Sequence, residues 1–146
     1  MDIGRGSFYL GDCLDIMPHL ENKSVDLIIC DLPYGTTACK WDSIIDFPSL
    51  WFEYNRICKG QKVLFGSQPF TTSLISSNIK NFKYSWIGEK NFATNFLHAK
   101  RQPLRKTEDI CIFDKGEYFP QKTTGHKPTQ SAKGTSKGVL WHGTNI

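Results

Sequence analysis

The sequence has no long apolar run and no closely spaced pair of cysteines. No stretch approaches the roughly 18 apolar residues of a membrane-spanning helix, and the first residues contain Asp2 and two glycines in place of the apolar core of a signal peptide. The five cysteines are odd in number and include no Cys-x-x-Cys pair, which argues against a zinc site and against a disulfide framework. We therefore expect a cytosolic protein, and 146 residues are enough for one domain with a substantial core.

Acidic and basic residues are unevenly divided along the chain. Residues 1–79 carry 6 Lys or Arg and 9 Asp or Glu, a charge of −3, whereas residues 80–146 carry 12 and 5, a charge of +7. An enzyme that acts on a neutral small molecule has no need of such a division, but a protein that lays one side on phosphates does. Lysines in a polar tail also serve simply as solubilising charges, so the division alone does not decide between these roles.

Residues 25–30 form a short apolar run that ends in Asp31 and is followed by Pro33, Tyr34 and Gly35. Five of the six residues in the run are apolar, which predicts a strand buried on both faces, as in a parallel sheet. Pro33 and Gly35 stop the strand, so Asp31 and Tyr34 are expected in the loop at its carboxyl end, where open α/β sheets place their ligands. There the ring of Tyr34 could stack on a flat heterocycle while the carboxylate of Asp31 accepts hydrogen bonds from the N–H groups of that heterocycle. The same residue types are also typical of an ordinary turn.

The rest of the pattern predicts short strands that alternate with helices, which is typical of an α/β layered sheet. Beyond residue 113, Ser, Thr, Gly and Lys dominate, and residues 114–138 are predicted to form a flexible basic segment. The predicted strands are residues 8–10, 25–30, 61–65, 84–87 and 109–113, and the predicted helices are residues 49–58 and 69–78. Residues 13–20 have apolar residues at helical spacing, but Pro18 argues against a long helix there.

Asp31-Leu32-Pro33-Tyr34 resembles the Asp-Pro-Pro-Tyr catalytic motif of the amino-group DNA methyltransferases, which make N6-methyladenine or N4-methylcytosine from S-adenosylmethionine. The likeness extends over about residues 8–113 and follows the members in which this motif precedes the cofactor glycine motif. The other segments that resemble the family are Leu10-Gly11-Asp12-Cys13-Leu14, Val25-Asp26-Leu27-Ile28, Leu64-Phe65-Gly66-Ser67-Gln68-Pro69-Phe70, Trp86-Ile87-Gly88-Glu89-Lys90, Phe96-Leu97-His98-Ala99-Lys100-Arg101-Gln102-Pro103-Leu104 and Glu108-Asp109-Ile110.

The resemblance implies an α/β fold, with a partial Rossmann-like methyltransferase sheet that carries helices on both faces. Residues 1–113 would be the catalytic-motif half of the domain, and residues 114–146 a basic, flexible start of the target-recognition region. It also implies a site-specific DNA methyltransferase of a bacterial or phage-infected cell, with S-adenosylmethionine as cofactor and double-stranded DNA with a flipped target base as partner. Restriction-modification systems use such enzymes.

The family also implies roles for particular residues. The acidic side chain and a main-chain carbonyl of the motif accept hydrogen bonds from the target amine, which localises its lone pair for attack on the methyl group, and the tyrosine stacks on the base. Leu32 stands where the family has proline, so the carbonyl is kept but the fixed φ of proline is lost. The implied catalytic residues are Asp31, Leu32, Pro33 and Tyr34; the cofactor-binding residues are Asp12, Cys13, Asp31, Phe65, Gly66 and Ser67; the DNA-binding residues are Lys90, Lys100, Arg101, Arg105 and Lys106.

Two of these assignments have simpler interpretations. Asp12 is equally well explained as the N-cap of a helix. Some of the five basic residues are expected to be ordinary surface charges.

The glycine-rich cofactor turn of the family, which resembles Asp-Pro-Phe-x-Gly-Ser-Gly-Thr, has no match in this chain. The sequence therefore resembles the amino-terminal half of a methyltransferase, and we expect a second polypeptide or a longer form to supply the cofactor-binding half. Three alternatives stay open: a cytosine-N4 enzyme, a non-catalytic remnant that binds DNA or a partner chain, and an RNA or protein amine methyltransferase. Asp31 favours a DNA base, and the overall match favours adenine. The absence of a Pro-Cys dipeptide argues against C5-cytosine methylation.

Overall fold

The computed structural model describes residues 2–3, 6–37, 39–40, 42–96, 99–117, 119–122 and 124–125. The chain divides into two units, residues 1–116 and residues 117–146. All helices and strands of the described residues belong to the first unit. Much of the predicted basic segment, from residue 126 onward, lies outside the described residues.

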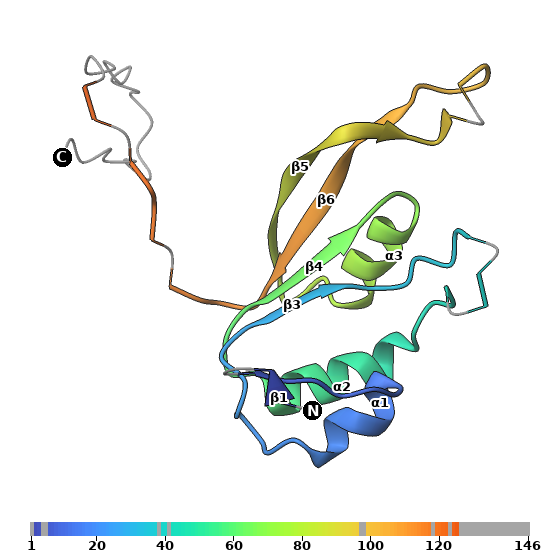
Figure 1. Cartoon of the computed structure of the whole chain (residues 1–146). Helices are drawn as coiled ribbons and strands as arrows, with labels where there is room; N and C mark the ends of the chain where they lie inside the picture. The colour runs from blue at the N-terminus through green and yellow to red at the C-terminus, as the bar shows by residue number, and fades with distance from the viewer. Residues whose placement is uncertain are drawn as a thin grey trace. The chain divides into compact units, whose positions relative to one another are not determined.

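The first unit is built on a mixed sheet with the strand order β3-β4-β6-β5 (Figure 1). β3 runs parallel to β4, whereas β6 runs antiparallel to both of its neighbours, β4 and β5. β3 and β4 therefore end at the same edge of the sheet, where Asp31 is the partner of Phe65. A separate antiparallel ladder joins β1 to β2. The strands are β1 Asp2–Ile3, β2 Gly6–Ser7, β3 Ile28–Asp31, β4 Lys62–Gly66, β5 Phe82–Thr94 and β6 Arg105–Phe113.

The helices begin at residues that favour helix starts. The Asp12 side chain accepts a hydrogen bond from the backbone N–H of Leu14 at 2.8 Å, and this hydrogen bond caps α1 (Cys13–Ile16). The helix α1 continues into the 3-10 turn η1 (Met17–His19). Asp46 accepts the backbone N–H of Ser49 at 3.0 Å and caps α2 (Phe47–Ile57) in the same way. α3 (Phe70–Ser77) begins directly after Pro69. No helix in the described part of the chain is long and apolar enough to cross a membrane.

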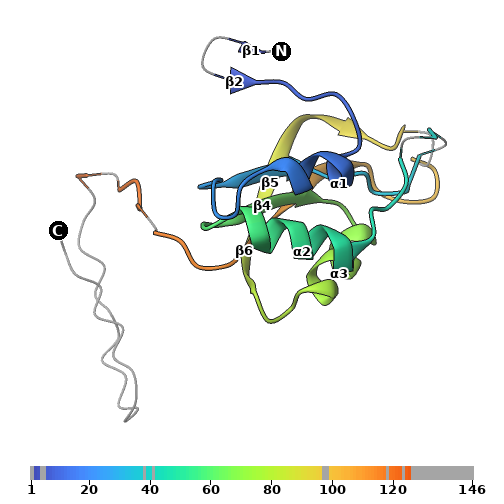
Figure 2. The ribbon, with the colours of Figure 1, turned by 90° about the horizontal axis from the view of Figure 1, so that it is seen from below.

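The three α-helices lie side by side on one face of the sheet (Figure 2). The connection from β3 through α2 to β4 and the connection from β4 through α3 to β5 both advance in the same direction across the sheet. Because such crossovers are almost always right-handed, both helices are placed on the same side. The expected α/β class is confirmed, but in the described residues helices cover one face of the sheet and not both.

A hydrophobic core fills the space between this helix layer and the sheet. Leu50 of α2, Leu74 of α3 and Leu64, Cys111 and Phe113 of the sheet are completely buried. Each buried aliphatic or aromatic side chain stabilises the fold by about 1.5–3 kcal/mol relative to an exposed one. The core holds the carboxyl ends of β3 and β4 in position.

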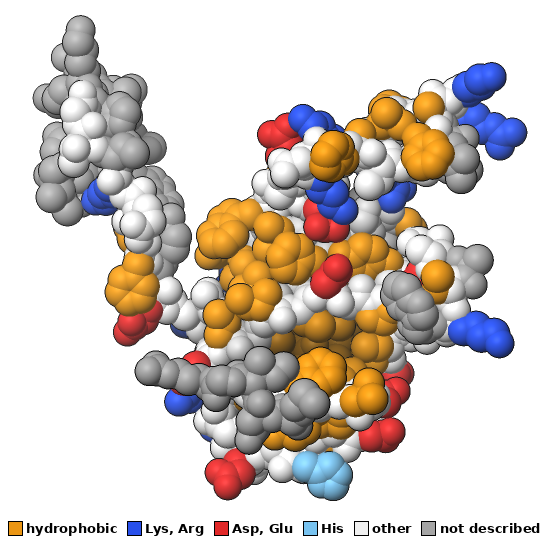
Figure 3. Space-filling view, viewed as in Figure 1, with side chains coloured by type: hydrophobic (Ala, Val, Ile, Leu, Met, Phe, Trp, Pro, Cys, Tyr) orange, Lys and Arg blue, Asp and Glu red, His pale blue; other side chains and the backbone are white. Residues whose placement is uncertain are grey.

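The opposite face of the sheet carries exposed apolar side chains. Leu27, Ile29 and Trp86 are 47%, 63% and 52% exposed, and Figure 3 shows hydrophobic side chains gathered over the sheet on this side. The prediction of a strand buried on both faces is therefore wrong for β3. The apolar run was interpreted as a sign of two covering layers, but the described residues supply only one.

β5 and β6 are longer than the sequence predicted. β4 pairs only with residues Asp109–Phe113 of β6, whereas β5 and β6 remain paired as far as Thr94 and Arg105. Residues 88–96 and 99–108 thus form a two-stranded projection beyond β4, which we call the hairpin arm (Figure 1). The predicted strand at residues 8–10 does not form, and Leu10 is 93% exposed.

Candidate active site

The side chains of Asp31 and Tyr34 meet at the carboxyl end of β3. Asp31 is the last residue of the strand, and the Tyr34 hydroxyl donates a hydrogen bond to Asp31 Oδ1 at 2.6 Å. Asp31 Oδ2 has no hydrogen-bond partner among the described residues. The pair therefore presents one carboxylate oxygen that is fixed by the protein and one that is free to accept from a ligand.

Leu32 has a structural role that the sequence did not reveal. Its side chain is only 5% exposed and belongs to the hydrophobic core. Burial of a leucine side chain stabilises the fold by about 1.5–3 kcal/mol. This packing helps to fix the backbone at position 32, where the family has a proline with a fixed φ. The departure from the family motif is thus offset by packing.

The ring of Tyr34 is held by aromatic contacts. It stacks on Phe70 of α3 with ring centroids 4.9 Å apart and an angle of 28° between the planes, and the Phe47 ring lies 5.9 Å from that of Phe70. Burial raises the pKa of Tyr34, and so do the hydrogen bond to Asp31 and the negative charges of Asp31 and Glu108. Tyr34 therefore stays protonated at neutral pH and acts as a hydrogen-bond donor.

Asp42 holds the loop that follows Tyr34. Its carboxylate accepts the backbone N–H groups of Gly35, Thr36 and Thr37 at 2.9, 2.9 and 2.6 Å, and the side chain is nearly buried. The Thr37 side chain and these three N–H groups lower the pKa of Asp42 to about 2, against the smaller opposing effect of burial. This loop closure was not predicted, although an aspartate that binds nearby backbone N–H groups is a known feature of tight loops.

We expect the Asp42→Asn variant to be less stable than the wild-type protein at pH 6, because it lacks the charged acceptor. The pKa of Asp42 is lower in the folded protein than its ordinary value of 3.8, so its contribution is complete above about pH 4 and is lost as the pH falls through about 2. The difference in melting temperature between the two proteins should therefore shrink over this range. Melting curves at several pH values would measure it, with Asp15→Asn on α1 as the control; a difference that stays constant would contradict the assignment.

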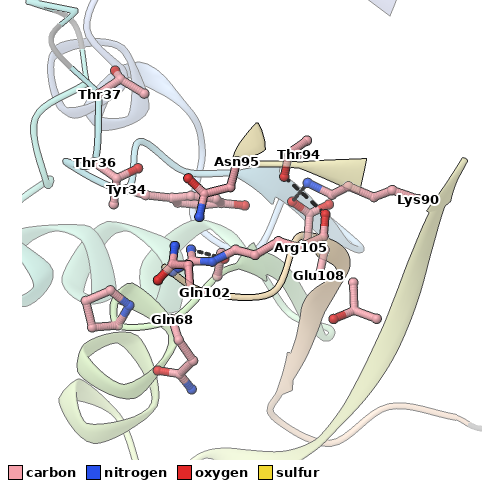
Figure 4. A pocket seen from close by; sticks show the side chains of 13 residues that line it. Tyr34, Thr36, Thr37, Gln68, Lys90, Thr94, Asn95, Gln102, Arg105 and Glu108 are labelled. Atoms are coloured by element: carbon pink, nitrogen blue, oxygen red, sulfur yellow. Dashed lines mark hydrogen bonds and ion pairs between the residues drawn. The ribbon is translucent and has the colours of Figure 1, made fainter. Parts of the chain in front are cut away.

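A cavity of about 470 Å³ opens beside Tyr34. Three parts of the chain line it: the loop that Asp42 holds, the turn between β4 and α3, and the hairpin arm. Lys90 Nζ and Glu108 Oε1 form an ion pair at 2.8 Å within the lining, and Arg105 Nη1 donates to Ser67 Oγ at 3.1 Å. The other polar side chains that line the cavity include Thr36, Thr37, Gln68, Asn95 and Gln102 (Figure 4). The cavity is therefore polar, with one aromatic wall.

A second cavity, of about 600 Å³, shares no lining residue with the first. Asp12 and Cys13 line it together with Pro33, whereas Tyr34 lines the first cavity. Burial and the charge of Asp12 raise the pKa of Cys13, so its thiol is neutral at physiological pH. Adjacent residues of the motif therefore line two different cavities, each of a size that suits a small molecule.

The structure places the predicted cofactor-binding residues in different surroundings. Asp12 and Cys13 share the second cavity, although Asp12 also caps α1, as its simpler interpretation predicted. Ser67 lines the first cavity instead. Asp31, Phe65 and Gly66 line neither cavity. A Cβ on Gly66 would lie 2.8 Å from Thr71 Oγ1, so close packing against α3 accounts for this glycine.

The predicted DNA-binding residues also separate into groups. Lys90 and Arg105 line the first cavity, and Lys106 is paired with Glu89 at 2.5 Å. Lys100 and Arg101 are exposed in the connection of the hairpin arm. The sequence pattern carried no sign of Gln68, Asn95, Gln102 or Glu108 as site residues, because they reach the cavity only through the arm and the turn after β4.

Comparisons with known proteins extend this description. No family model matches the chain. The crystal structure of M1.HpyAVI in complex with SAM superimposes with a TM-score of 0.54 and 20% identity, covering 82% of this chain and 62% of that protein. A protein of Thermus thermophilus, provisionally named as a DNA modification methylase, gives a TM-score of 0.49 and 17% identity, covering 77% of this chain and 54% of the other. The chain thus spans about three fifths of the length of M1.HpyAVI. Over most of its length it has the α/β fold of M1.HpyAVI, the fold that the resemblance to methyltransferases led us to expect.

Proposed function

We propose that this protein is the catalytic-motif portion of a DNA methyltransferase that transfers a methyl group from S-adenosylmethionine to an exocyclic amine of a base. One observation carries the proposal: Pro33 and Tyr34, which are adjacent in the motif, line two different cavities. A base in the first cavity and a cofactor in the second would meet at this motif. The shared fold with M1.HpyAVI, which was crystallised with SAM, supports the choice of cofactor.

In the first cavity, the chain's own residues would hold and activate the base. Phe70 covers one face of the Tyr34 ring, and the ring would stack on the base with its other face, a contact that contributes about 1–3 kcal/mol in single-strand systems. Asp31 Oδ2 and the Leu32 carbonyl would accept the two amine hydrogens. The Tyr34 hydroxyl donates to Asp31 Oδ1, which leaves Oδ2 for this contact.

The residues of the second cavity fit part of the cofactor. Leu14 and Ile45 supply apolar surface for a ring system, and the carboxylates of Asp12 and Asp46 supply negative charge, which suits a ligand with a positively charged sulfonium and amine. When bound, S-adenosylmethionine supplies an activated methyl group. The glycine-rich turn that would hold its other parts has no counterpart in this chain.

Double-stranded DNA is the substrate that the charges favour. Residues 80–146 carry a charge of +7, and Lys100 and Arg101 are exposed on the hairpin arm, next to strands that line the first cavity. Because the amine of a paired base is engaged in base pairing, the target would have to leave the helix before it could reach Asp31.

Adenine N6 is the target that we favour over cytosine N4. The amide side chains of Gln68, Asn95 and Gln102 line the cavity, and an amide can pair with the amine donor and the adjacent ring-nitrogen acceptor of either base. The choice of adenine therefore rests on the overall match of the sequence segments to the family. The missing glycine turn supports a second candidate, a non-catalytic remnant that binds DNA or a partner chain.

The test is to identify the methylated nucleoside. The chain, combined with the remaining portion of the enzyme, would be incubated with tritiated S-adenosylmethionine and genomic DNA, and the digested DNA separated by chromatography. We expect the label in N6-methyladenine. Label in N4-methylcytosine would overturn the choice of base only, whereas unlabelled DNA would support the non-catalytic remnant.

A further inference from the structure

The hairpin arm projects beyond the sheet that supports it. Its two strands pair with each other as far as Thr94 and Arg105, while the neighbouring strand β4 ends at Gly66, opposite Asp109. Figure 1 shows the arm extending past β4 and α3. A two-stranded ribbon of this kind has the width that fits a groove of DNA.

The outer part of the arm carries only positive charge. Residues 91–107 contain Lys100, Arg101, Arg105 and Lys106 and no aspartate or glutamate. Glu89 pairs with Lys106, but Lys100 and Arg101 are exposed at the end of the arm. Figure 3 shows basic side chains at the end of the arm next to hydrophobic ones.

The hydrophobic side chains include two strongly exposed phenylalanines. Phe92 is 84% exposed and Phe96 is 73% exposed. They flank Thr94 and Asn95, which line the cavity beside Tyr34. Apolar rings with so little contact to their own protein, beside exposed positive charges, are typical of a surface that receives a partner.

We propose that Phe92 and Phe96 form an aromatic wedge that enters the base stack of DNA at the gap left by the target base. This inference rests on the proposed function, because a base that moves into the cavity beside Tyr34 leaves such a gap in the duplex. Side chains inserted between bases are an established way for a protein to hold distorted DNA, and every base offers a face on which a phenyl ring can stack. The same segment of the hairpin arm would then carry both the wedge and part of the cavity lining, which couples filling of the gap to capture of the base.

The test uses duplexes that need no knowledge of the target sequence. Fluorescence anisotropy would compare the binding of the full chain to an intact duplex of about 20 base pairs, roughly two helical turns, and to the same duplex with a central tetrahydrofuran abasic site. A wedge gains stacking in the preformed gap, so we expect the abasic duplex to be bound about tenfold more tightly, the range that stacking on one ring allows. The Phe92→Ala/Phe96→Ala variant should lose this preference and keep both the salt-dependent binding of the intact duplex and its circular dichroism spectrum.

Two control variants separate the possible outcomes. Phe52→Ala removes a ring that is 68% exposed on α2 and should keep the preference, while Lys100→Ala/Arg101→Ala should weaken binding of both duplexes equally. A preference that is absent from the wild-type protein, or that survives in the Phe92→Ala/Phe96→Ala variant, would overturn the wedge but leave the proposed function standing. If the chain bound neither duplex, both proposals would fall.

Discussion

Replacing Asp31 with alanine is expected to abolish measurable methyl transfer in the complete enzyme while DNA binding stays nearly unchanged. The exocyclic amine of adenine is a poor nucleophile because its lone pair is delocalised into the ring, and the proposed role of Asp31 Oδ2 is to accept one of its hydrogens. Removal of a single such electrostatic contact lowers kcat by about 10²–10³-fold in other enzymes. Here the loss should be at least as large, because the carboxylate is one of only two proposed acceptors.

Two other variants make this result specific. Asp26→Ala removes an exposed carboxylate that lies before β3 and pairs with Lys59 at 2.7 Å, and it should leave methyl transfer unaffected. Tyr34→Phe keeps the ring that stacks on Phe70 but removes the hydroxyl that donates to Asp31, so it should lower activity less than Tyr34→Ala does. Tritiated methyl transfer under single-turnover conditions would measure all of these. Near-normal turnover by Asp31→Ala would contradict the assignment.

The second large effect concerns the cofactor. We expect residues 1–146 alone to bind S-adenosylmethionine weakly or not at all and to show no methyl transfer. Cofactor binding and methyl transfer should both appear when the glycine-containing portion of the enzyme is added. The second cavity has residues for part of the ligand only, and the chain spans 62% of the length of M1.HpyAVI. In the described residues β3 is an edge strand, and Leu27, Ile29 and Trp86 are exposed on the uncovered face of the sheet. Added strands and helices could cover both surfaces.

Calorimetric titration of the purified chain with S-adenosylmethionine tests this expectation directly. The matched measurement repeats the titration after the remaining portion has been added as a separate polypeptide, and light scattering records whether the two associate. A Leu27→Ser/Ile29→Ser variant, changed only on the uncovered face, should weaken that association. Tight one-to-one binding of the cofactor by the chain alone would refute the prediction.

Local sequence patterns were enough to predict the elements that are stabilised by burial. α2, α3 and β4 lie within two residues of their predicted bounds, because Leu50, Leu64 and Leu74 occur at the spacing of a helix or strand that faces a core. β5 and β6 were underestimated, since their outer parts are held by pairing with each other and bury few apolar side chains. Periodicity carries no information about such pairing.

Some residues of the candidate site were likewise predicted from local sequence patterns, and others were not. Asp31, Pro33 and Tyr34 were found from the sequence alone because a carboxylate, a proline and an aromatic residue after an apolar strand have a chemical meaning at the end of a sheet. Asp42, Phe70 and Glu108 were not found. They contact the motif or its loop across 7 to 74 positions of the sequence, and only the folded chain brings them together.

The sequence by itself determined the α/β class, the motif at the end of β3 and its likeness to the methyltransferases, because these depend on residue types that are close together in the chain. Only the tertiary structure decided that the helices share one face, that Leu32 is a core residue and that Pro33 and Tyr34 line different cavities. It also showed that the Tyr34 hydroxyl, and not only its ring, contacts the site through Asp31. Each of these depends on which distant segments pack against β3, and that is set by strand order and crossover handedness, which neighbouring residues do not encode.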